Sequence, residues 1–288
     1  QNGIIVPKGI VVNKIDVGAA DPSIQNSEGI SLGTSASELS FENKKLNYTK
    51  FKEEILEQLK NNNLNFPLVV KPQHEGSSLG VSIVNDLENL VQAIIKACYI
   101  DSNNKQDVIV EEKIEGLEFS CLILVDYKTG QPIPLPPTEI VPEDGSKFWD
   151  YEQKYMPGRS KKFTPARCSQ EQIKLIQETC VKVMKTLEMS TIARIDGFLT
   201  KDSQVVIVDP NTLSGMAPSS ILFRQAAEID MSHTQTINHL IKTELALKNK
   251  NLDFEPDYKE NSMQEKIKVA VIFGGKSNER EISLESGR

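Results

Sequence analysis

The chain has 288 residues, of which 39% are hydrophobic and 25% charged, and its formal net charge is −7 at pH 7. This length can form two domains, and this composition is typical of globular proteins with an apolar core. The acidic balance, without a lysine- or arginine-rich stripe, argues against nucleic acid or an anionic membrane surface as the main partner. No apolar stretch has the length needed to cross a bilayer, so no membrane partner is expected.

The four cysteines are scattered along the chain and include no C-x-x-C pair. Such a pattern is typical of reduced thiols in a cytoplasmic protein rather than of a disulfide framework or a zinc site. The chain also opens on Gln1 and lacks a signal-peptide pattern, so we expect a piece of a longer cytoplasmic protein.

The first half of the chain predicts strands and helices around a glycine-punctuated loop. Residues 4–13 predict a short pair of strands around a turn, and residues 17–46 predict a long polar surface loop. Apolar residues at helical spacing predict one helix from Tyr48 onward and another over residues 87–98. Between them, the strands PLVV and GVSIV enclose the loop that follows Lys71.

The second half predicts strands at DVIVEEKI, FSCLILV, TIARIDGFLT and QVVIVDPN. Residues 142–166 are polar and aromatic without a core period, so a loop is expected there. Capping boxes predict that one helix follows Ser169 and Gln172 and that another follows Ser232 and Gln235. The final KIKVAVIFGGKSNER predicts the first strand and turn of another fold.

The hairpin ARIDGFLTKDSQVVIVDPN carries four polar side chains. A two-residue turn at 202–203 would place Asp196 opposite Asp209 and Arg194 opposite Asn211. Residues two apart share a face, so all four would project to one side. Opposed carboxylates repel, and a Mg²⁺ held by carboxylate and amide oxygens would offset that repulsion, with a phosphate donor nearby. The alternative is a solvent-facing polar side on which Arg194 neutralises Asp196.

The loop VKPQHEGSSLG has the chemistry of an anion site, although its residue order is not that of a P-loop. Lys71 supplies a positive charge for phosphate, and the Ser77 and Ser78 hydroxyls can donate to anionic oxygens. Gly76 and Gly80 allow the backbone to approach a ligand closely. The alternative is an ordinary polar turn.

A third polar cluster lies in VIVEEKIEGLEF, where Glu111 and Glu118 flank a tight turn. A carboxylate there can accept from an exocyclic amine or from ribose hydroxyls, and the strand backbone can contact an adenine edge. The alternative is an exposed acidic turn.

In order and spacing, the stretches VVKPQHEGSSLGVS, VIVEEKIEGLEFS, FWDYEQKY, ARIDGFLT and VDPNTLSGMAPSS together resemble the D-alanine–D-alanine ligase family of the ATP-grasp superfamily. The resemblance extends from residue 3 to about residue 241. It implies an α+β ATP-grasp fold, in which two subdomains with antiparallel sheets clasp ATP. Residues 1–115 would form the first subdomain and residues 116–248 the C-terminal one.

Residues 249–288 would form a linker and the start of a second ligase copy, because KVAVIFGGKSNEREISLESG resembles the beginning of the same family. This order suggests a tandem duplication, with a circular permutation as the other arrangement. The first strand and turn of a following pre-ATP-grasp domain would then end the chain. A homodimer and an intramolecular pairing with the second copy are both open.

The resemblance implies ATP and two Mg²⁺ ions as cofactors, with Mn²⁺ as a substitute metal. The nucleotide residues that it implies are Lys71 and Lys154 at the phosphates, Glu111, Glu112 and Ile114 at the adenine, and Glu118 at the ribose. The metal ligands that it implies are Asp196, Asp209 and Asn211. All are named from their positions in the matching stretches.

Catalysis is assigned by the same resemblance to Arg194, Ser77, Tyr155 and Gly215. Arg194 and the backbone near Gly215 would stabilise a tetrahedral intermediate, and Tyr155, on a lid loop, would join Ser77 at the substrate. The substrate residues that it implies are Ser220 and Ile221, at the second amino acid's carboxylate, and Glu279, at the first substrate's ammonium.

The expected activity is ATP-dependent ligation of a carboxylate to an amine through an acyl phosphate, with D-alanyl-D-alanine synthesis for the peptidoglycan cell wall as the first expectation. Departures from the family at Asp209, Leu213-Ser214 and residues 218–224 raise two alternatives. One is a ligase for a different amino-acid pair, and the other is a non-catalytic nucleotide-binding copy in a tandem protein. The expected partners are small-molecule amino-acid substrates.

Overall fold

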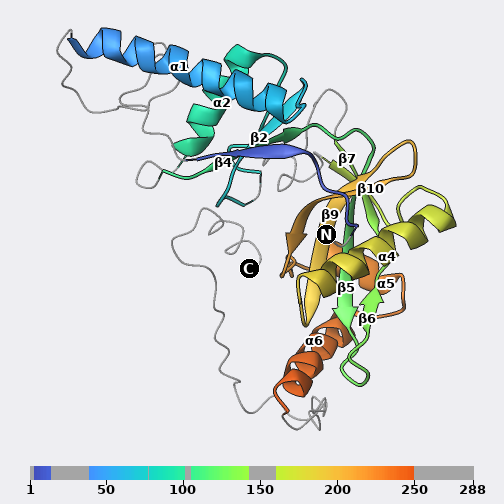
Figure 1. The fold of residues 1–288 in the computed structure, drawn as a ribbon. Helices are drawn as coiled ribbons and strands as arrows, with labels where there is room; N and C mark the ends of the chain where they lie inside the picture. The colour runs from blue at the N-terminus through green and yellow to red at the C-terminus, as the bar shows by residue number, and fades with distance from the viewer. Residues whose placement is uncertain (1–2, 14–38, 77, 101–104, 143–159, 250–288) are drawn as a thin grey trace. The chain divides into compact units, whose positions relative to one another are not determined.

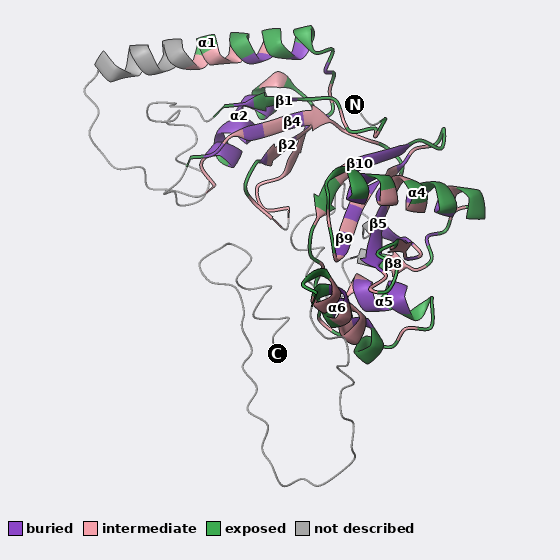
Figure 2. Ribbon diagram, turned by 60° about the horizontal axis from the view of Figure 1, so that its bottom comes forward, coloured by how far each residue is buried: buried purple, intermediate pink, exposed green. Residues whose placement is uncertain are grey.

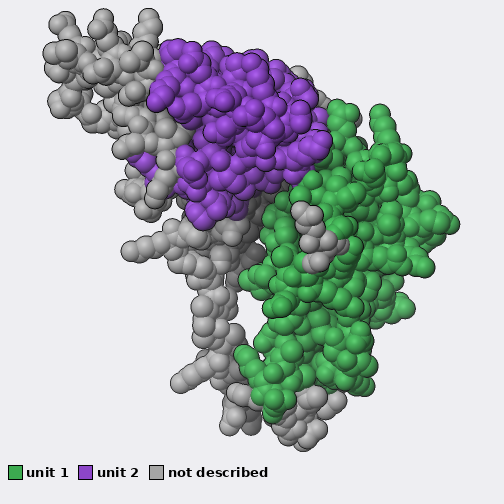
Figure 3. All heavy atoms as spheres, viewed as in Figure 1, with its two compact units in different colours: residues 1–6, 114–288 green, residues 7–113 purple. Residues whose placement is uncertain are grey.

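The computed structural model describes residues 3–13, 39–76, 78–100, 105–142 and 160–249. The chain divides into two compact units, which Figure 3 shows in separate colours. Residues 7–113 form one unit, and residues 1–6 together with 114–288 form the other. We call them the N-terminal unit and the C-terminal unit and describe each by itself.

The N-terminal unit is a four-stranded antiparallel sheet with two helices (Figure 1). In chain order its elements are β1 (Gly9–Val12), α1 (Leu39–Asn61), β2 (Leu68–Pro72), β3 (Ser82–Val84), α2 (Leu87–Cys98) and β4 (Val108–Glu112). The strand order is β1-β4-β2-β3. Alternate residues of β2, among them Leu68 and Val70, are buried with both helices in one core, whereas Lys71 lies on the other face.

Two predictions for this unit were wrong. Helix α1 begins at Leu39, inside the predicted loop, because LSFENKKLN contains good helix formers but no apolar period that would reveal them. Residues 4–13 do not pair with each other. Strand β1 pairs with β4, whereas Ile5 forms a bridge with Val206 of the C-terminal unit, so this segment contributes to both units.

The C-terminal unit is a six-stranded antiparallel sheet between helices. Its elements are β5 (Leu117–Val125), β6 (Pro132–Pro134), β7 (Thr138–Pro142), β8 (Ser160–Phe163), α4 (Gln170–Thr186), β9 (Ile192–Leu199), β10 (Val205–Asn211), α5 (Ile221–Ala227) and α6 (His233–Leu247). The strand order is β10-β9-β5-β7-β8, and β6 pairs with β5. No helix in the described ranges combines the length and apolarity of a membrane span.

Each face of this sheet has its own apolar core. Phe119, Cys121 and Ile195 pack against α4 on one face, whereas Leu122 and Leu124 pack against α5 and α6 on the other. Strand β5 is therefore buried along most of its length, as its purple colour in Figure 2 shows. Residues on the α5 side of the sheet that lie beyond this second core form the candidate site.

The helix starts in this unit follow the sequence prediction. The predicted capping boxes are present at the starts of α4 and α6, where Ser169 pairs with Gln172 and Ser232 pairs with Gln235. The predicted loop over residues 142–166 contains β8, whose short polar sequence SKKF carries little strand signal. Helix α5 was not predicted, because its seven residues span only two turns.

Candidate functional site

The hairpin formed by β9 and β10 has the predicted pairing but not the predicted turn. Asp209 lies opposite Asp196 and Asn211 opposite Arg194, as expected. The turn has three residues rather than two, because the Thr200 amide donates to the Gln204 carbonyl at 2.9 Å. A β-bulge between Ile207 and Asp209 takes up the difference in register.

This bulge also decides which face each residue of β10 occupies. Val205 and Ile207 lie in the core under α4, together with Ile195 of β9. Without the bulge, Asp209 would follow Ile207 onto that apolar face, because residues two apart share a face. With it, Asp209 and Asn211 lie on the α5 side of the sheet, with Arg194 and Asp196.

Three of the four polar side chains of the hairpin, those of Arg194, Asp196 and Asn211, are in contact, and Asn211 also contacts the backbone of Asp209. The Arg194 Nε and Asp196 Oδ2 atoms are 3.2 Å apart, and an Arg194 terminal nitrogen lies 3.1 Å from the same oxygen. The Asn211 Nδ2 atom lies 3.5 Å from Asp196 Oδ2 and 3.2 Å from the Asp209 carbonyl oxygen. Arg194 therefore neutralises Asp196, as the alternative interpretation expects, but every one of these contacts to Asp196 uses Oδ2.

Three buried side-chain oxygens in the described part of the chain have no hydrogen-bond partner: Asp196 Oδ1, Ser120 Oγ and Ser220 Oγ. Ser120 lies directly opposite Asp196 on the neighbouring strand, and Ser220 precedes α5, which packs on the same side of the sheet. A buried polar group without a partner costs about 1–3 kcal/mol. Their occurrence on one side of one sheet indicates a site that a ligand completes.

A buried glutamine fixes α5 to this side of the sheet. Gln225 is fully buried, and its Nε2 atom donates to the Ser120 carbonyl at 2.7 Å and contacts Thr138 Oγ1 at 3.0 Å. Its Oε1 atom accepts from the Leu122 amide at 2.9 Å. Gln225 thereby positions Ser220, at the start of α5, relative to the strand that carries Ser120. Sequence reasoning missed it, and the one available signal is a glutamine inside the apolar run ILFRQAA.

The residues of the hairpin fit a hard cation. Carboxylate and amide oxygens are the ligands that Mg²⁺ prefers, and Asp196 has a buried oxygen without another partner. No group of three or more His, Cys, Asp or Glu side chains with metal-ligand geometry occurs among the described residues. An ion at this hairpin would therefore depend on Asn211 and on ligand oxygens in addition to Asp196 and Asp209.

Glu118 extends the same side of the sheet toward β7. It lies two residues before Ser120 on β5 and pairs with Phe198 and Ile140, so it faces the α5 side. Ile114 precedes β5, and Gly215 lies exposed in the loop after β10. Ile221 is the first residue of α5.

In the N-terminal unit, Lys71 and Glu111 form an ion pair with 2.8 Å between Lys71 Nζ and Glu111 Oε1. They lie on neighbouring antiparallel strands, where Glu111 pairs with Val69, so Lys71 is its diagonal neighbour on the face away from the core. Both are partly buried. The two residues predicted to contact opposite parts of ATP thus neutralise each other in the free chain.

The glycine loop after β2 is anchored by another buried glutamine. Gln106 Oε1 accepts from the His74 amide at 2.7 Å, and Gln106 Nε2 donates to Glu75 Oε1 at 3.0 Å. Gly80 has a φ of +73°, and a Cβ atom there would lie 2.4 Å from Ile100 Cδ1. The fold of the loop itself therefore requires this glycine, which is a different reason from the predicted approach of a ligand.

Glu112 at the end of β4 is already engaged with the start of the chain. Its amide donates to the Lys8 carbonyl at 2.9 Å, and its Oε1 atom accepts from the Lys8 amide at 2.9 Å. An adenine contact from the Glu112 backbone would therefore use its carbonyl oxygen. The remaining predicted site residues, Ser77, Lys154, Tyr155 and Glu279, lie outside the described residues.

Burial and charge shift the pKa of three groups in the C-terminal unit. The Arg167 guanidinium, which binds both oxygens of Glu139 at 2.8 Å, lowers the pKa of that carboxyl below its usual range. Burial, together with the positive charge of Arg224, lowers the pKa of Lys162. Burial raises the pKa of the Cys180 thiol, which is one of four free cysteines.

Comparison with known proteins identifies the family of this chain. The family model for the D-Ala D-Ala ligase C-terminus matches residues 36–242. A D-alanine–D-alanine ligase of Halalkalibacterium halodurans is 35% identical over 181 residues, which are 62% of this chain and 57% of that protein. The chain thus spans a little over half the length of such relatives.

Solved structures show the same fold. The VanG D-Ala:D-Ser ligase from Enterococcus faecalis superimposes with a TM-score of 0.61 and 29% identity, over 84% of this chain and 57% of that one. The D-alanine–D-alanine ligase from Bacillus anthracis complexed with ATP has a TM-score of 0.54 and 21% identity, over 86% of this chain and 61% of that one. These similarities confirm the predicted α+β ATP-grasp fold.

Proposed function

Because the chain belongs to the family defined by the D-Ala D-Ala ligase C-terminus, we propose that it binds ATP and catalyses the ligation of a carboxylate to an amine. The observation that carries the proposal is the polar side of the C-terminal sheet. There Arg194 and Asn211 contact Asp196, Asp209 lies opposite Asp196, and a carboxylate oxygen and nearby hydroxyl oxygens are buried without partners.

The reaction needs little covalent chemistry from the protein. The γ-phosphoryl group of ATP passes to a substrate carboxylate, ADP leaves, and the amine of a second substrate displaces inorganic phosphate from the acyl phosphate. Positioned charges supply most of the catalysis in such transfers. Lys71 would bind the nucleotide phosphates, and Arg194 would stabilise the tetrahedral intermediate together with the backbone near Gly215. Ser77, Lys154 and Tyr155 keep the substrate and lid roles that the family resemblance implies.

The metal ligands proposed are Asp196, Asp209 and Asn211, with two Mg²⁺ ions and Mn²⁺ as a substitute. The metal would supply neutralisation of the phosphate charge. Asp196 Oδ1 is the ligand atom that the structure supports most directly, because it is buried and unpaired.

For the nucleotide base we propose Glu111, Glu112 and Ile114 at the adenine and Glu118 at the ribose. Since Lys71 and Glu111 form an ion pair in the free chain, ATP would open that pair and give each residue a new partner. Part of the favourable free energy of ATP binding would therefore be offset by the loss of this ion pair.

We further propose that residues 1–115 and 116–248 act as the two ATP-grasp subdomains of a cytoplasmic enzyme. Residues 249–288 would lead into a second ligase copy that pairs with the first, unless the chain forms homodimers. Glu279 would then bind the first substrate's ammonium in one of the copies.

D-Alanine is the proposed first substrate, in the synthesis of D-alanyl-D-alanine for peptidoglycan. Ser220 and Ile221 would hold the carboxylate of the second amino acid, and Ser220 Oγ has no other partner. Two observations favour an acceptor amino acid other than D-alanine. The segment 213–224 departs from the family pattern, and the solved relative at 29% identity is named as a D-Ala:D-Ser ligase.

Calorimetric titration of the chain with ATP, with and without Mg²⁺, tests this function. We expect Mg²⁺-dependent binding that Asp209→Asn weakens by about tenfold or more, because the variant removes a charged ligand. Asp202→Asn is the matched control, since Asp202 lies in the turn of the same hairpin. ATP binding that does not depend on Mg²⁺, or an equal loss of ATP affinity in both variants, would exclude the proposed site. Phosphate release with D-alanine then separates an enzyme from a non-catalytic copy.

A further inference from the structure

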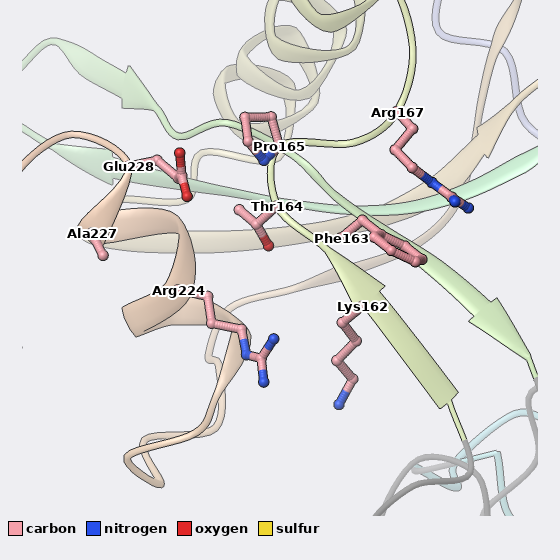
Figure 4. Close-up of a pocket in the computed structure, with 8 residues that line it drawn as sticks. All are labelled: Lys162, Phe163, Thr164, Pro165, Arg167, Arg224, Ala227 and Glu228. Carbon is pink, nitrogen blue, oxygen red and sulfur yellow. The ribbon is translucent and has the colours of Figure 1, made fainter.

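A pocket of about 490 Å³ lies in the C-terminal unit, between β8 and α5. Figure 4 shows the residues that line it, and three of them are cationic: Lys162, Arg167 and Arg224. Glu228 is the acidic residue of the lining.

Arg167 is the cation of this pocket whose charge a neighbouring carboxylate balances. It binds both carboxylate oxygens of Glu139, and its guanidinium lies 3.7 Å from the centre of the Phe163 ring. Its charge is therefore balanced inside the protein and is not available to a ligand.

Lys162 and Arg224 have no such balance among the described residues. Neither forms an ion pair there within 4 Å, and the one side-chain hydrogen bond of Arg224 to a described residue runs from its Nε to the Ser219 carbonyl at 3.4 Å. In Figure 4 both side chains extend toward the same side of the pocket, whereas Glu228 lies on the opposite side. Each positive charge repels the other, which disfavours the charged form of both side chains. Burial and Arg224 together lower the pKa of Lys162. An anion bound between the two cations would offset this repulsion.

The pocket lies beside the proposed acceptor residues. Ser220, Arg224 and Glu228 are spaced four residues apart, so they follow one side of α5. Lys162 pairs with Ile140, which in turn pairs with Glu118, so Lys162 faces the same side of the sheet as Asp196. The cationic end of the pocket is thus continuous with the side on which Ser220 Oγ is buried without a partner.

We propose that Lys162 and Arg224 bind a second acidic group on the acceptor amino acid, a side-chain carboxylate in addition to the one held at Ser220. The assignment rests on the proposed ligase function. Four residues of helix, a rise of about 6 Å, separate Ser220 from Arg224, which is comparable to the separation of the two carboxylates in an acidic amino acid. Lysine and arginine together favour a carboxylate over the neutral side chain of alanine or serine.

Calorimetric titration in the presence of Mg²⁺ and a non-hydrolysable ATP analogue tests the inference. The probes are D-aspartate, D-glutamate, D-alanine and inorganic phosphate, and the variants are Lys162→Met and Arg224→Met. Lys174→Met is the control, because Lys174 is an exposed lysine on α4, which packs on the other face of the sheet. Thermal unfolding of each variant shows that it is folded.

We expect an acidic amino acid to bind about tenfold or more tightly than D-alanine, and each variant of the pocket to remove that preference without changing the affinity for D-alanine. Equal affinity for acidic amino acids and D-alanine would overturn the inference, as would an equal loss in Lys174→Met. Inorganic phosphate that binds as tightly and depends on the same two residues would overturn the assignment to the acceptor. If the ATP analogue itself does not bind, the proposed function fails, whereas bound analogue without acidic preference refutes this inference alone.

Discussion

The two units differ in whether their polar site residues have partners within the protein. In the N-terminal unit, Lys71 and Glu111 satisfy each other in a partly buried ion pair. In the C-terminal unit, Arg194 contacts one oxygen of Asp196 and leaves the other buried without a partner, beside the unpartnered hydroxyl of Ser120. The first arrangement is complete without a ligand, and the second is not. A ligand should therefore stabilise the C-terminal unit more than the N-terminal one.

The largest effect that separates the units concerns their anchoring glutamines. We expect Gln225→Leu to lower the free energy of unfolding by about 3 kcal/mol, because it leaves the Leu122 amide and the Ser120 carbonyl buried without these partners. Gln106→Leu is the matched change in the N-terminal unit and should cost about 1 kcal/mol, since its partners lie in a less buried loop. Urea unfolding measures both, and equal costs would show that the two anchors are equivalent.

The next effect concerns ligand dependence. We expect Asp196→Asn to weaken Mg²⁺-dependent ATP binding by about 100-fold, which corresponds to about 2.7 kcal/mol. Without ligand, the same variant weakens only the partly buried contact of Oδ2 with Arg194, because Oδ1 has no partner, so the unfolding free energy should change by about 1 kcal/mol. Calorimetry and urea unfolding of one preparation give both quantities. A loss of unfolding free energy as large as the loss of ATP-binding free energy would contradict the proposed difference between the two units.

The ion pair of the N-terminal unit should contribute to stability without ligand as well as to ATP binding. Lys71→Met and Glu111→Gln should each weaken ATP binding about tenfold, and a double-mutant cycle without ligand should give a coupling free energy of about 1 kcal/mol. Unfolding of the two single variants and the double variant completes the cycle. Zero coupling would mean that this pair, like Asp196, depends on a ligand.

The smallest effect is a dependence on pH. Arg167 lowers the pKa of Glu139 in the folded chain, so the folded state binds fewer protons than the unfolded state in the acid range. Stability from this pair is therefore present above the usual carboxyl pKa, about 4.3, and is lost as the pH falls below it. Glu139→Gln should flatten this part of the stability curve, as measured by urea unfolding from pH 6 downward. An unchanged slope would show that other carboxyls dominate.

The comparison of units also shows which parts of the site a sequence can predict. The closeness of Asp196 and Asp209 was predictable because β9 and β10 are consecutive strands, but their exact pairing agrees with the prediction only because the bulge after Ile207 offsets a turn one residue longer than predicted. The contact of Lys71 with Glu111 was not, since it depends on the register of β2 and β4, with α2 between them in the chain. Gln225 and Gln106 were also missed, because their roles depend on backbone groups of distant strands and loops.

Short elements escaped prediction for a related reason. Strand β8 is held by its pairing with β7, and helix α5 by packing and by Gln225; neither depends on a periodicity of its own, which four or seven residues cannot display. The pocket formed by Lys162 and Arg224 lies between these two elements. The two described elements of the C-terminal unit with the weakest sequence signal thus carry Lys162 and Arg224, the two cations of this pocket without a counter-charge.

The bulge in β10 has a consequence for insertions and deletions in this hairpin. A chain without Val208 would still place Asp209 next after Ile207 and opposite Asp196, so the deletion should preserve the polar side. Removal of Pro210 would instead move Asn211 one position and turn its side chain toward the apolar face. Two neighbouring one-residue deletions should thus have opposite outcomes, and tolerance to length variation in this strand should change within two positions along the chain.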